Sequence, residues 1–151
     1  MPDEVSELLE AAIYKEIASQ ALYEAAQMKA QDPGAKALLK ELAAEELKHL
    51  QLLKNLREEE MGQGTWHRKK VPNLMISEYL TGPDTLEGAG LQETIVFAMK
   101  REQQAVEFYA RMMGVMRNRS AKHLCQRLAS EELEHKLRLE TFYDDFFYME
   151  D

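Results

Sequence analysis

Apolar and small residues recur along this chain at alternating steps of four and three positions, the spacing that places them on one face of an α-helix. Four segments carry the pattern, at about residues 5–26, 35–56, 95–112 and 121–142. The pattern therefore predicts an all-α protein in which four amphipathic helices bury a shared apolar face.

Helix-breaking and helix-capping residues stand at the two points where consecutive helical segments meet. Asp32 is suited to cap the second helix, and Pro33 suits its first position. Asn118 or Ser120 is the corresponding cap in the second half of the chain. Because both turns are short, each half of the chain is expected to form an antiparallel helical hairpin.

Residues 63–88 interrupt the helical period with glycine and proline, apart from a short helix expected at 73–80. An extended chain rises about 3.3 Å per residue, so this stretch is long enough to return along the length of a bundle. We expect it to be one long crossover that joins the two hairpins within a single domain spanning residues 1–151.

The two halves of the chain repeat one another. Residues 5–56 align onto 91–142 without a gap, at an offset of 86 positions, with 14 identities in 52 positions. An open array of repeats needs more than two copies, so two copies are expected to close on each other. The repeat therefore predicts a four-helix bundle with pseudo-two-fold symmetry.

Ionisable side chains occupy positions on the apolar stripes, where a charge is costly unless it is paired. They fall at equivalent positions of the two halves: Glu16, Glu46, His49, Glu102, Glu132 and His135. The four glutamates are equally distant along the chain from their nearest turns, so we expect them at one level near the middle of the bundle.

Two Glu-x-x-His motifs define the chemistry of this set. Glu46 and His49 form the first, and Glu132 and His135 form the second. Residues three apart on a helix share a face, so each motif aims a carboxylate and an imidazole at one point. Mixed oxygen and nitrogen ligands favour Fe, Mn or Zn over Mg or Ca. We therefore predict a dinuclear metal site in which the two glutamates bridge and each histidine binds one ion.

Glu16 and Glu102 are the expected outer carboxylates of that site, so that four negative charges balance two divalent ions. Tyr23 and Tyr109 lie seven residues further along the same helical faces. Helical side chains lean toward the helix N-terminus, so each phenol is placed to donate a hydrogen bond to a site carboxylate. Ordinary core packing with a satisfied hydroxyl is the alternative for both tyrosines.

Other titratable residues are expected to be structural. Glu45 and Glu131 project about 100° away from the apolar stripe, which favours exposure to solvent. His67 and His123 lie outside the repeated ligand positions. Cys125 takes a core position, where it acts as a small hydrophobic residue.

The composition excludes several classes of function. A net charge of −8 argues against nucleic acid as a partner. The sequence has no apolar run of about 18 residues that could span a membrane, and its acidic first residues do not resemble a signal peptide. With one cysteine, neither an intrachain disulfide nor a four-cysteine iron centre can form. We expect a cytoplasmic protein.

Together these motifs, glutamates and tyrosines resemble the ferritin-like di-iron carboxylate superfamily, and within it the rubrerythrin-like proteins. The resemblance covers residues 5–56 and 91–142 and implies a ferritin-like four-helix bundle that holds two iron ions. Unlike rubrerythrins, this sequence shows no C-terminal rubredoxin domain, and Ala105 stands where they carry a further glutamate. Leu47 stands where bacterioferritin-like proteins place a haem-binding methionine.

The resemblance implies peroxide reduction, dioxygen activation, Fe(II) oxidation or iron storage. We expect a non-haem di-iron oxidoreductase that reduces peroxide or dioxygen with electrons from a separate donor protein, with manganese or zinc as alternative metals. A non-enzymatic iron or manganese binding or storage protein and a purely structural bundle are the alternatives. The aromatic segment 142–148 favours a homodimer.

Overall fold

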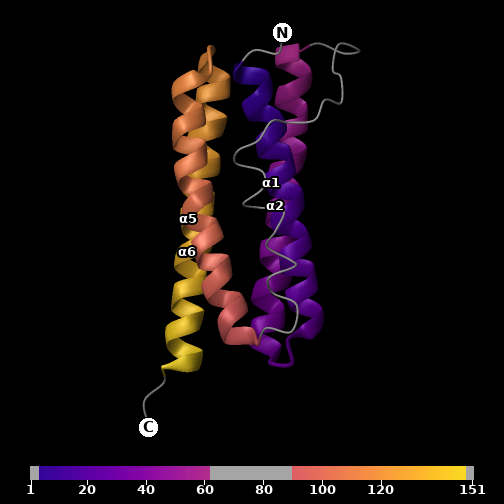
Figure 1. Ribbon diagram of the computed structural model, residues 1–151, viewed down its shortest axis with the longest axis vertical. Coiled ribbons are helices and arrows are strands. Elements are labelled where there is room, and N and C mark those ends of the chain that lie inside the picture. The colour runs from indigo at the N-terminus through magenta and orange to yellow at the C-terminus, as the bar shows by residue number, and fades with distance from the viewer. Residues whose placement is uncertain (1–3, 62–89, 149–151) are drawn as a thin grey trace.

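The computed structural model describes residues 4–61 and 90–148 of the chain. Within these residues the chain forms four long helices, α1 (Glu4–Lys29), α2 (Pro33–Met61), α5 (Leu91–Val115) and α6 (Arg119–Phe147) (Figure 1). The predicted all-α four-helix bundle is therefore confirmed. The crossover predicted at 63–88 and its short helix at 73–80 lie outside the described residues.

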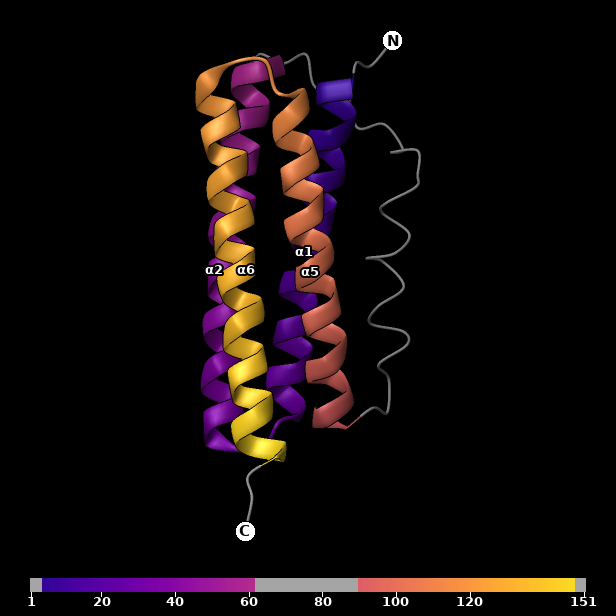
Figure 2. The same cartoon turned by 90° about the vertical axis from the view of Figure 1, so that its left-hand side faces the viewer.

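The four helices are arranged as two antiparallel hairpins. Helix α1 packs along α2, and α5 packs along α6, with closer association inside each hairpin than between hairpins. Between the hairpins, α1 lies beside α5 and α2 lies beside α6, as the two views together show (Figures 1 and 2). Equivalent helices of the two repeats are therefore neighbours, and all four helices face a shared interior.

Matching side-chain caps begin the second helix of each hairpin. The Asp32 carboxylate accepts a hydrogen bond of 2.9 Å from the backbone N–H of Ala35. In the other half, the Asn118 side chain accepts one of 2.7 Å from the backbone N–H of Ala121. Each cap satisfies one of the backbone donors that the first turn of a helix leaves unpaired. The two turns are thus built on the same principle.

The apolar core is divided into two clusters of buried residues. One lies at the end where α1 begins and α5 ends, and it includes Leu9, Leu53 and Leu128. The other lies at the opposite end and includes Leu39 and Leu42. Burial of each leucine contributes roughly 1.5–3 kcal/mol, so both ends of the bundle are held by hydrophobic packing. The layer between the clusters contains the polar residues described below.

Helix α6 extends beyond the apolar pattern, which ended at about residue 142, into the aromatic segment and ends at Phe147. The rings of Phe142 and Phe146 stack with centroids 5.1 Å apart, while Tyr148 is 61% exposed. Tyr143 accepts a hydrogen bond of 2.9 Å from the Gln92 side chain, which ties the end of α6 to the start of α5.

Among the described residues, no helix is both long and apolar enough to cross a membrane.

Candidate metal centre

The ionisable residues found on the apolar stripes converge in the layer between the two core clusters. Helices α1 and α5 each supply one glutamate, and α2 and α6 each supply one glutamate and one histidine. All are at most 2% exposed: Glu16, Glu46, His49, Glu102, Glu132 and His135. The structure thus brings together every metal ligand predicted from the sequence, at one level of the bundle.

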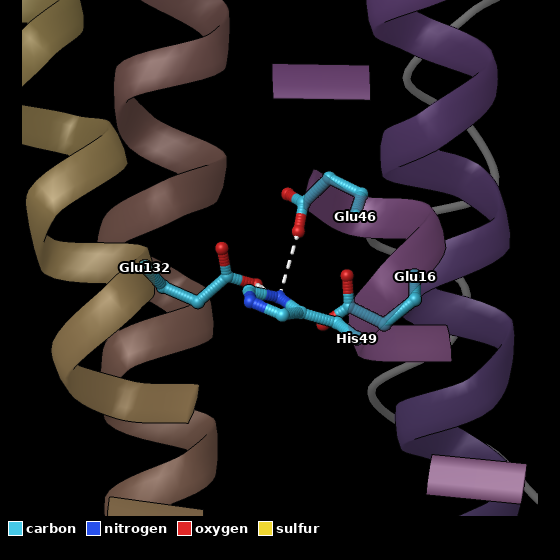
Figure 3. A group of neighbouring side chains, drawn as sticks. All are labelled: Glu16, Glu46, His49 and Glu132. Atoms are coloured by element: carbon cyan, nitrogen blue, oxygen red, sulfur yellow. Dashed lines mark ion pairs between the residues drawn. The ribbon is translucent and has the colours of Figure 1, made fainter. Parts of the chain in front are cut away.

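One group of four residues surrounds the Nδ1 atom of His49, and we call it position A: Glu16, Glu46, His49 and Glu132. One ligand atom from each residue lies within 4.8 Å of the others. His49 Nδ1 is 3.0 Å from Glu46 Oε1, and it is 3.7 Å from Glu132 Oε2 and 3.8 Å from Glu16 Oε2. Figure 3 shows these four side chains pointing toward one another from α1, α2 and α6.

A second group surrounds the Nδ1 atom of His135, and we call it position B: Glu46, Glu102, Glu132 and His135. His135 Nδ1 is 3.0 Å from Glu132 Oε1 and 3.4 Å from Glu102 Oε2. It is 3.7 Å from Glu46 Oε2. Position B is therefore related to position A by the pseudo-two-fold symmetry of the repeat.

Glu46 and Glu132 belong to both positions. Each turns one carboxylate oxygen toward His49 and the other toward His135. The two imidazole rings lie nearly parallel, with centroids 5.6 Å apart. Two carboxylates shared in this way between two nitrogen ligands are the arrangement expected of groups that bridge a pair of metal ions.

Buried polar atoms without a hydrogen-bond partner indicate that the cluster fits cations. Among the described residues, these atoms include Nδ1 of both histidines and at least one oxygen of all four glutamates. Leaving such an atom unpaired costs about 1–3 kcal/mol, and more for a charged group. Metal ions bound between these atoms would satisfy them together. The donor set of carboxylates and imidazoles therefore suits a pair of divalent transition metals.

Burial and mutual repulsion make the cluster hard to ionise without cations. Burial, together with the charges of Glu132 and Glu16, raises the pKa of Glu46 to about 7. Burial and the charge of Glu132 raise the pKa of Glu102 well above its usual value. These shifts are the expected behaviour of several carboxylates that share one dry site.

The other nitrogen of each imidazole meets a carboxylate from the opposite hairpin. His49 Nε2 is 2.7 Å from Glu131 Oε1, and His135 Nε2 is 2.7 Å from Glu45 Oε1. These contacts orient each ring so that its Nδ1 faces the cluster. Glu45 and Glu131 were expected to be exposed, and this expectation was wrong, since only about one third of each side chain is exposed (33% and 34%).

Arginines hold these two carboxylates in turn. Arg127 donates a hydrogen bond of 2.8 Å to Glu131, and Arg138 donates one of 3.2 Å to Glu45. Partial burial alone would raise the pKa of Glu131, but hydrogen bonds from Arg127 and His49 lower it. The pKa of Glu45 is lowered in the same way by His135 and Arg138. Both carboxylates therefore stay ionised and available to the imidazoles.

The two predicted tyrosines reach across the bundle to the outer carboxylates. Tyr23 donates a hydrogen bond of 2.5 Å to Glu102, and Tyr109 donates a short hydrogen bond to Glu16. Tyr23 belongs to one apolar cluster and Tyr109 to the other, so the phenols close the polar layer from both sides. Burial, followed by the neighbouring carboxylates, raises the pKa of both phenols, which keeps them protonated as donors.

Lys15 is a functional candidate that the sequence analysis missed. Its side chain is 1% exposed, and its Nζ lies 3.1 Å from Glu132 Oε2 and 3.5 Å from Glu16 Oε2. Burial would raise the pKa of Glu132, but the Lys15 ammonium and both imidazoles hold it well below the usual value. The signal was present in the repeat, because the equivalent position holds another basic residue, Arg101.

Two of the remaining candidates, His123 and Cys125, do not belong to the cluster. His123 is exposed on α6, and His67 lies outside the described residues. Cys125 is buried within an apolar cluster, as predicted, and burial raises the pKa of its thiol to about 11.

A buried, repeated set of glutamates and histidines inside a four-helix bundle is typical of helical proteins that bind metal between their helices. A family model described as rubrerythrin matches residues 7–143, and the chain belongs to this family. The resemblance drawn from the sequence motifs is therefore confirmed. The family and the buried cluster together indicate a metal-binding site.

The fold is also similar to that of a solved structure, a hypothetical protein from Pyrococcus furiosus. The two chains share 26% sequence identity and superpose with a TM-score of 0.77. The similarity covers 98% of this chain and 93% of the other. No curated protein matches the sequence.

Proposed function

We propose that this protein is a non-haem di-iron oxidoreductase that reduces peroxide or dioxygen. The single observation that carries the proposal is the pair of overlapping ligand groups, which share Glu46 and Glu132 and contain buried atoms without hydrogen-bond partners. The proposed ligands are Glu16, Glu46, His49 and Glu132 at position A, and Glu46, Glu102, Glu132 and His135 at position B. Manganese or zinc would suit the same donors.

When bound, two Fe(II) ions supply the two electrons that convert one hydrogen peroxide and two protons into two water molecules. The protein's own groups prepare the site for this reaction. The four carboxylates balance the charge of two divalent ions, and Glu131 and Glu45 hold the imidazoles in orientation. Tyr23 and Tyr109 fix the outer carboxylates, while the two apolar clusters exclude bulk water.

Small side chains beside the outer carboxylates support a site for a small oxidant. Ala12 and Ser19 lie one turn on either side of Glu16, and Ala98 and Ala105 flank Glu102 in the same way. All are buried. Their size limits crowding around the cluster, which favours peroxide or dioxygen over larger substrates.

A separate protein is the proposed source of electrons, because positions A and B are the groups of candidate metal ligands found among the described residues, and the one cysteine of the chain is buried. The single cysteine also favours a reducing, cytoplasmic location. We propose a homodimer, supported by the exposed aromatic residues Phe146 and Tyr148 at the end of α6.

Stopped-flow mixing tests the reaction. Protein loaded anaerobically with two Fe(II) per chain is mixed with hydrogen peroxide and, separately, with dioxygen. We expect oxidation much faster than that of free Fe(II), with one peroxide consumed per two irons. His135→Ala should abolish this reaction, while His123→Ala, an exposed position on the same helix, should leave it unchanged. Absence of oxidation by either oxidant within minutes contradicts the proposal.

A second candidate function is non-enzymatic binding or storage of iron or manganese. The observation that favours it is Ala105, which stands where the rubrerythrin-like pattern has a further glutamate. In this case equilibrium dialysis should show reversible loading and release of metal. The same loaded protein should then give no oxidant-dependent turnover in the stopped-flow experiment.

A further inference from the structure

The two halves of the repeat differ at the residue that precedes each outer carboxylate. Lys15 precedes Glu16 on α1, and Arg101 occupies the equivalent position before Glu102 on α5. Both are buried, at 1% and 4% exposure. The Lys15 ammonium lies among the cluster's carboxylates, whereas Arg101 Nη2 reaches Ser19 Oγ at 3.4 Å. The pseudo-symmetry is therefore broken by where the two charged groups lie, because the Lys15 ammonium contacts carboxylates of the cluster and Arg101 Nη2 contacts Ser19.

Among the described ion pairs, the Lys15 ammonium directly contacts two oxygens, and both face position A. Its Nζ contacts Glu132 Oε2 and Glu16 Oε2 at 3.1 and 3.5 Å. These are the same oxygens that face His49 Nδ1, at 3.7 and 3.8 Å, in position A. Position B instead presents the other oxygen of Glu132, together with an oxygen of Glu102 and the second oxygen of Glu46.

A cation entering position A must therefore share two of its oxygens with an ammonium or displace it. Like charges interact strongly where water is excluded, because the effective dielectric constant is low. Lys15 also donates a hydrogen bond to Glu132 Oε2, which makes that oxygen a weaker metal ligand. In position B, the oxygen that Glu132 presents is not the one that the ammonium contacts, and the charge of Lys15 acts on Glu46 and Glu102 electrostatically.

We propose that positions A and B differ in their affinity for metal and that Lys15 is the residue that causes the difference. Position B fills first and holds its divalent transition metal. Position A fills second, binds more weakly and exchanges its ion. This inference rests on the proposed function to the extent that the cluster takes two metal ions.

Anaerobic titration with Mn²⁺, followed by calorimetry and electron paramagnetic resonance, tests the inference without a turnover assay. The wild-type protein should bind two ions in separate steps, the second roughly tenfold to a hundredfold weaker than the first. Lys15→Met should strengthen the second step by about tenfold or more, because the charge is removed and the length is kept. Arg101→Met is the matched control at the equivalent buried position, and it should leave the ratio unchanged.

Histidine variants assign the two steps. His49→Gln should lose the weak step and keep the tight one, and His135→Gln should lose the tight step. Lys15→Arg keeps the charge and should therefore keep the weak second step. Together with the two histidine variants, it tests the inference even where Lys15→Met does not fold.

Equal affinities in the wild-type protein overturn the inference and leave the proposed di-metal function standing. An unchanged ratio in Lys15→Met, or loss of the tight step in His49→Gln, overturns it as well. Binding of no Mn²⁺ and no Fe²⁺ by the wild-type protein contradicts the proposed function itself. The two failures are therefore distinguishable.

Discussion

The α1–α2 hairpin and the α5–α6 hairpin supply the same types of residue to the centre of the bundle, yet neither can complete a site alone. Each contributes two glutamates and one histidine from equivalent positions. Each of the two metal positions, however, draws ligands from both hairpins. Each repeated hairpin therefore supplies half of the cluster, and the complete cluster forms only where the two hairpins pack together.

The contacts that support the ligands also cross between hairpins. Tyr23 of the first hairpin donates to Glu102 of the second, and His49 of the first contacts Glu131 of the second. The reverse contacts, from Tyr109 to Glu16 and from His135 to Glu45, complete the symmetry. Packing is closer inside each hairpin than between them, so this polar layer is a main link between the halves.

The largest effect is expected from removing Glu132, which belongs to both position A and position B. Glu132→Ala removes one oxygen from each metal position and leaves the Lys15 ammonium without its nearest partner. We expect loss of tight metal binding at both positions, measured by anaerobic Fe(II) titration. Glu134→Ala, at an exposed position on the same helix, is the control and should bind like the wild type. Full retention of both ions in Glu132→Ala contradicts the assignment of a shared ligand.

Glu131 and Glu45 each contact a histidine of the opposite hairpin, so substituting them should affect one metal position at a time. Glu131→Gln should weaken binding at position A, through His49, by roughly tenfold to a hundredfold. Glu45→Gln should weaken position B, through His135, by a similar factor. Metal titration of the two variants measures which step changes. If both substitutions weaken the same step, the contacts of Glu131 with His49 and of Glu45 with His135 do not control metal affinity.

Metal removal tests how far the polar layer joins the halves. A ligand present at about a hundred times its dissociation constant stabilises the native state by about 2.7 kcal/mol. For a domain of this size, that corresponds to a melting temperature lower by roughly 5–10 °C after chelation. Differential scanning calorimetry of loaded and chelated protein measures the shift. The same comparison on Glu132→Ala should show little shift, and an equal shift in both proteins would mean that the metal binds elsewhere.

The smallest effect is expected at Cys125, whose equivalent in the other half is Leu39. Both side chains are fully buried, so we assign the thiol the packing role of the leucine. Burial raises the pKa of Cys125 to about 11, and stability linked to this thiol is lost as the pH rises from its usual pKa of 9.0 toward that value.

At pH 8 the Cys125 thiol should therefore be protonated and react with a disulfide reagent only after denaturation. Absorbance of the released thiolate measures this reaction. Rapid labelling of the native protein contradicts the assigned packing role.

The sequence allowed prediction of the fold and of which residues converge, for a specific physical reason. Glu16, Glu46 and their counterparts stand on apolar stripes, where periodicity alone reveals a misplaced charge. The helix caps followed from residue types at the turns, and the structure confirms Asn118 rather than Ser120 as the cap of α6. The metal roles of the converging residues stay predictions that the titrations above address.

The residues that were missed depend on contacts between helices, which periodicity does not encode. Glu45 and Glu131 leave the apolar stripe by about 100°, yet their flexible side chains reach a histidine on the neighbouring helix. Lys15 likewise extends from a position beside the stripe to carboxylates on α1 and α6. Which long side chain turns inward depends on the separation of the helices and on the charge already buried there.

We propose that carboxylates are buried inside this bundle because a pair of bound cations neutralises them. Equilibrium dialysis against excess Fe(II) under anaerobic conditions, followed by elemental analysis, tests it most directly. We expect two iron ions per wild-type chain and no retained pair in a Glu46→Ala, Glu132→Ala double variant. Binding of no iron by the wild-type chain, or the same amount by both proteins, contradicts it.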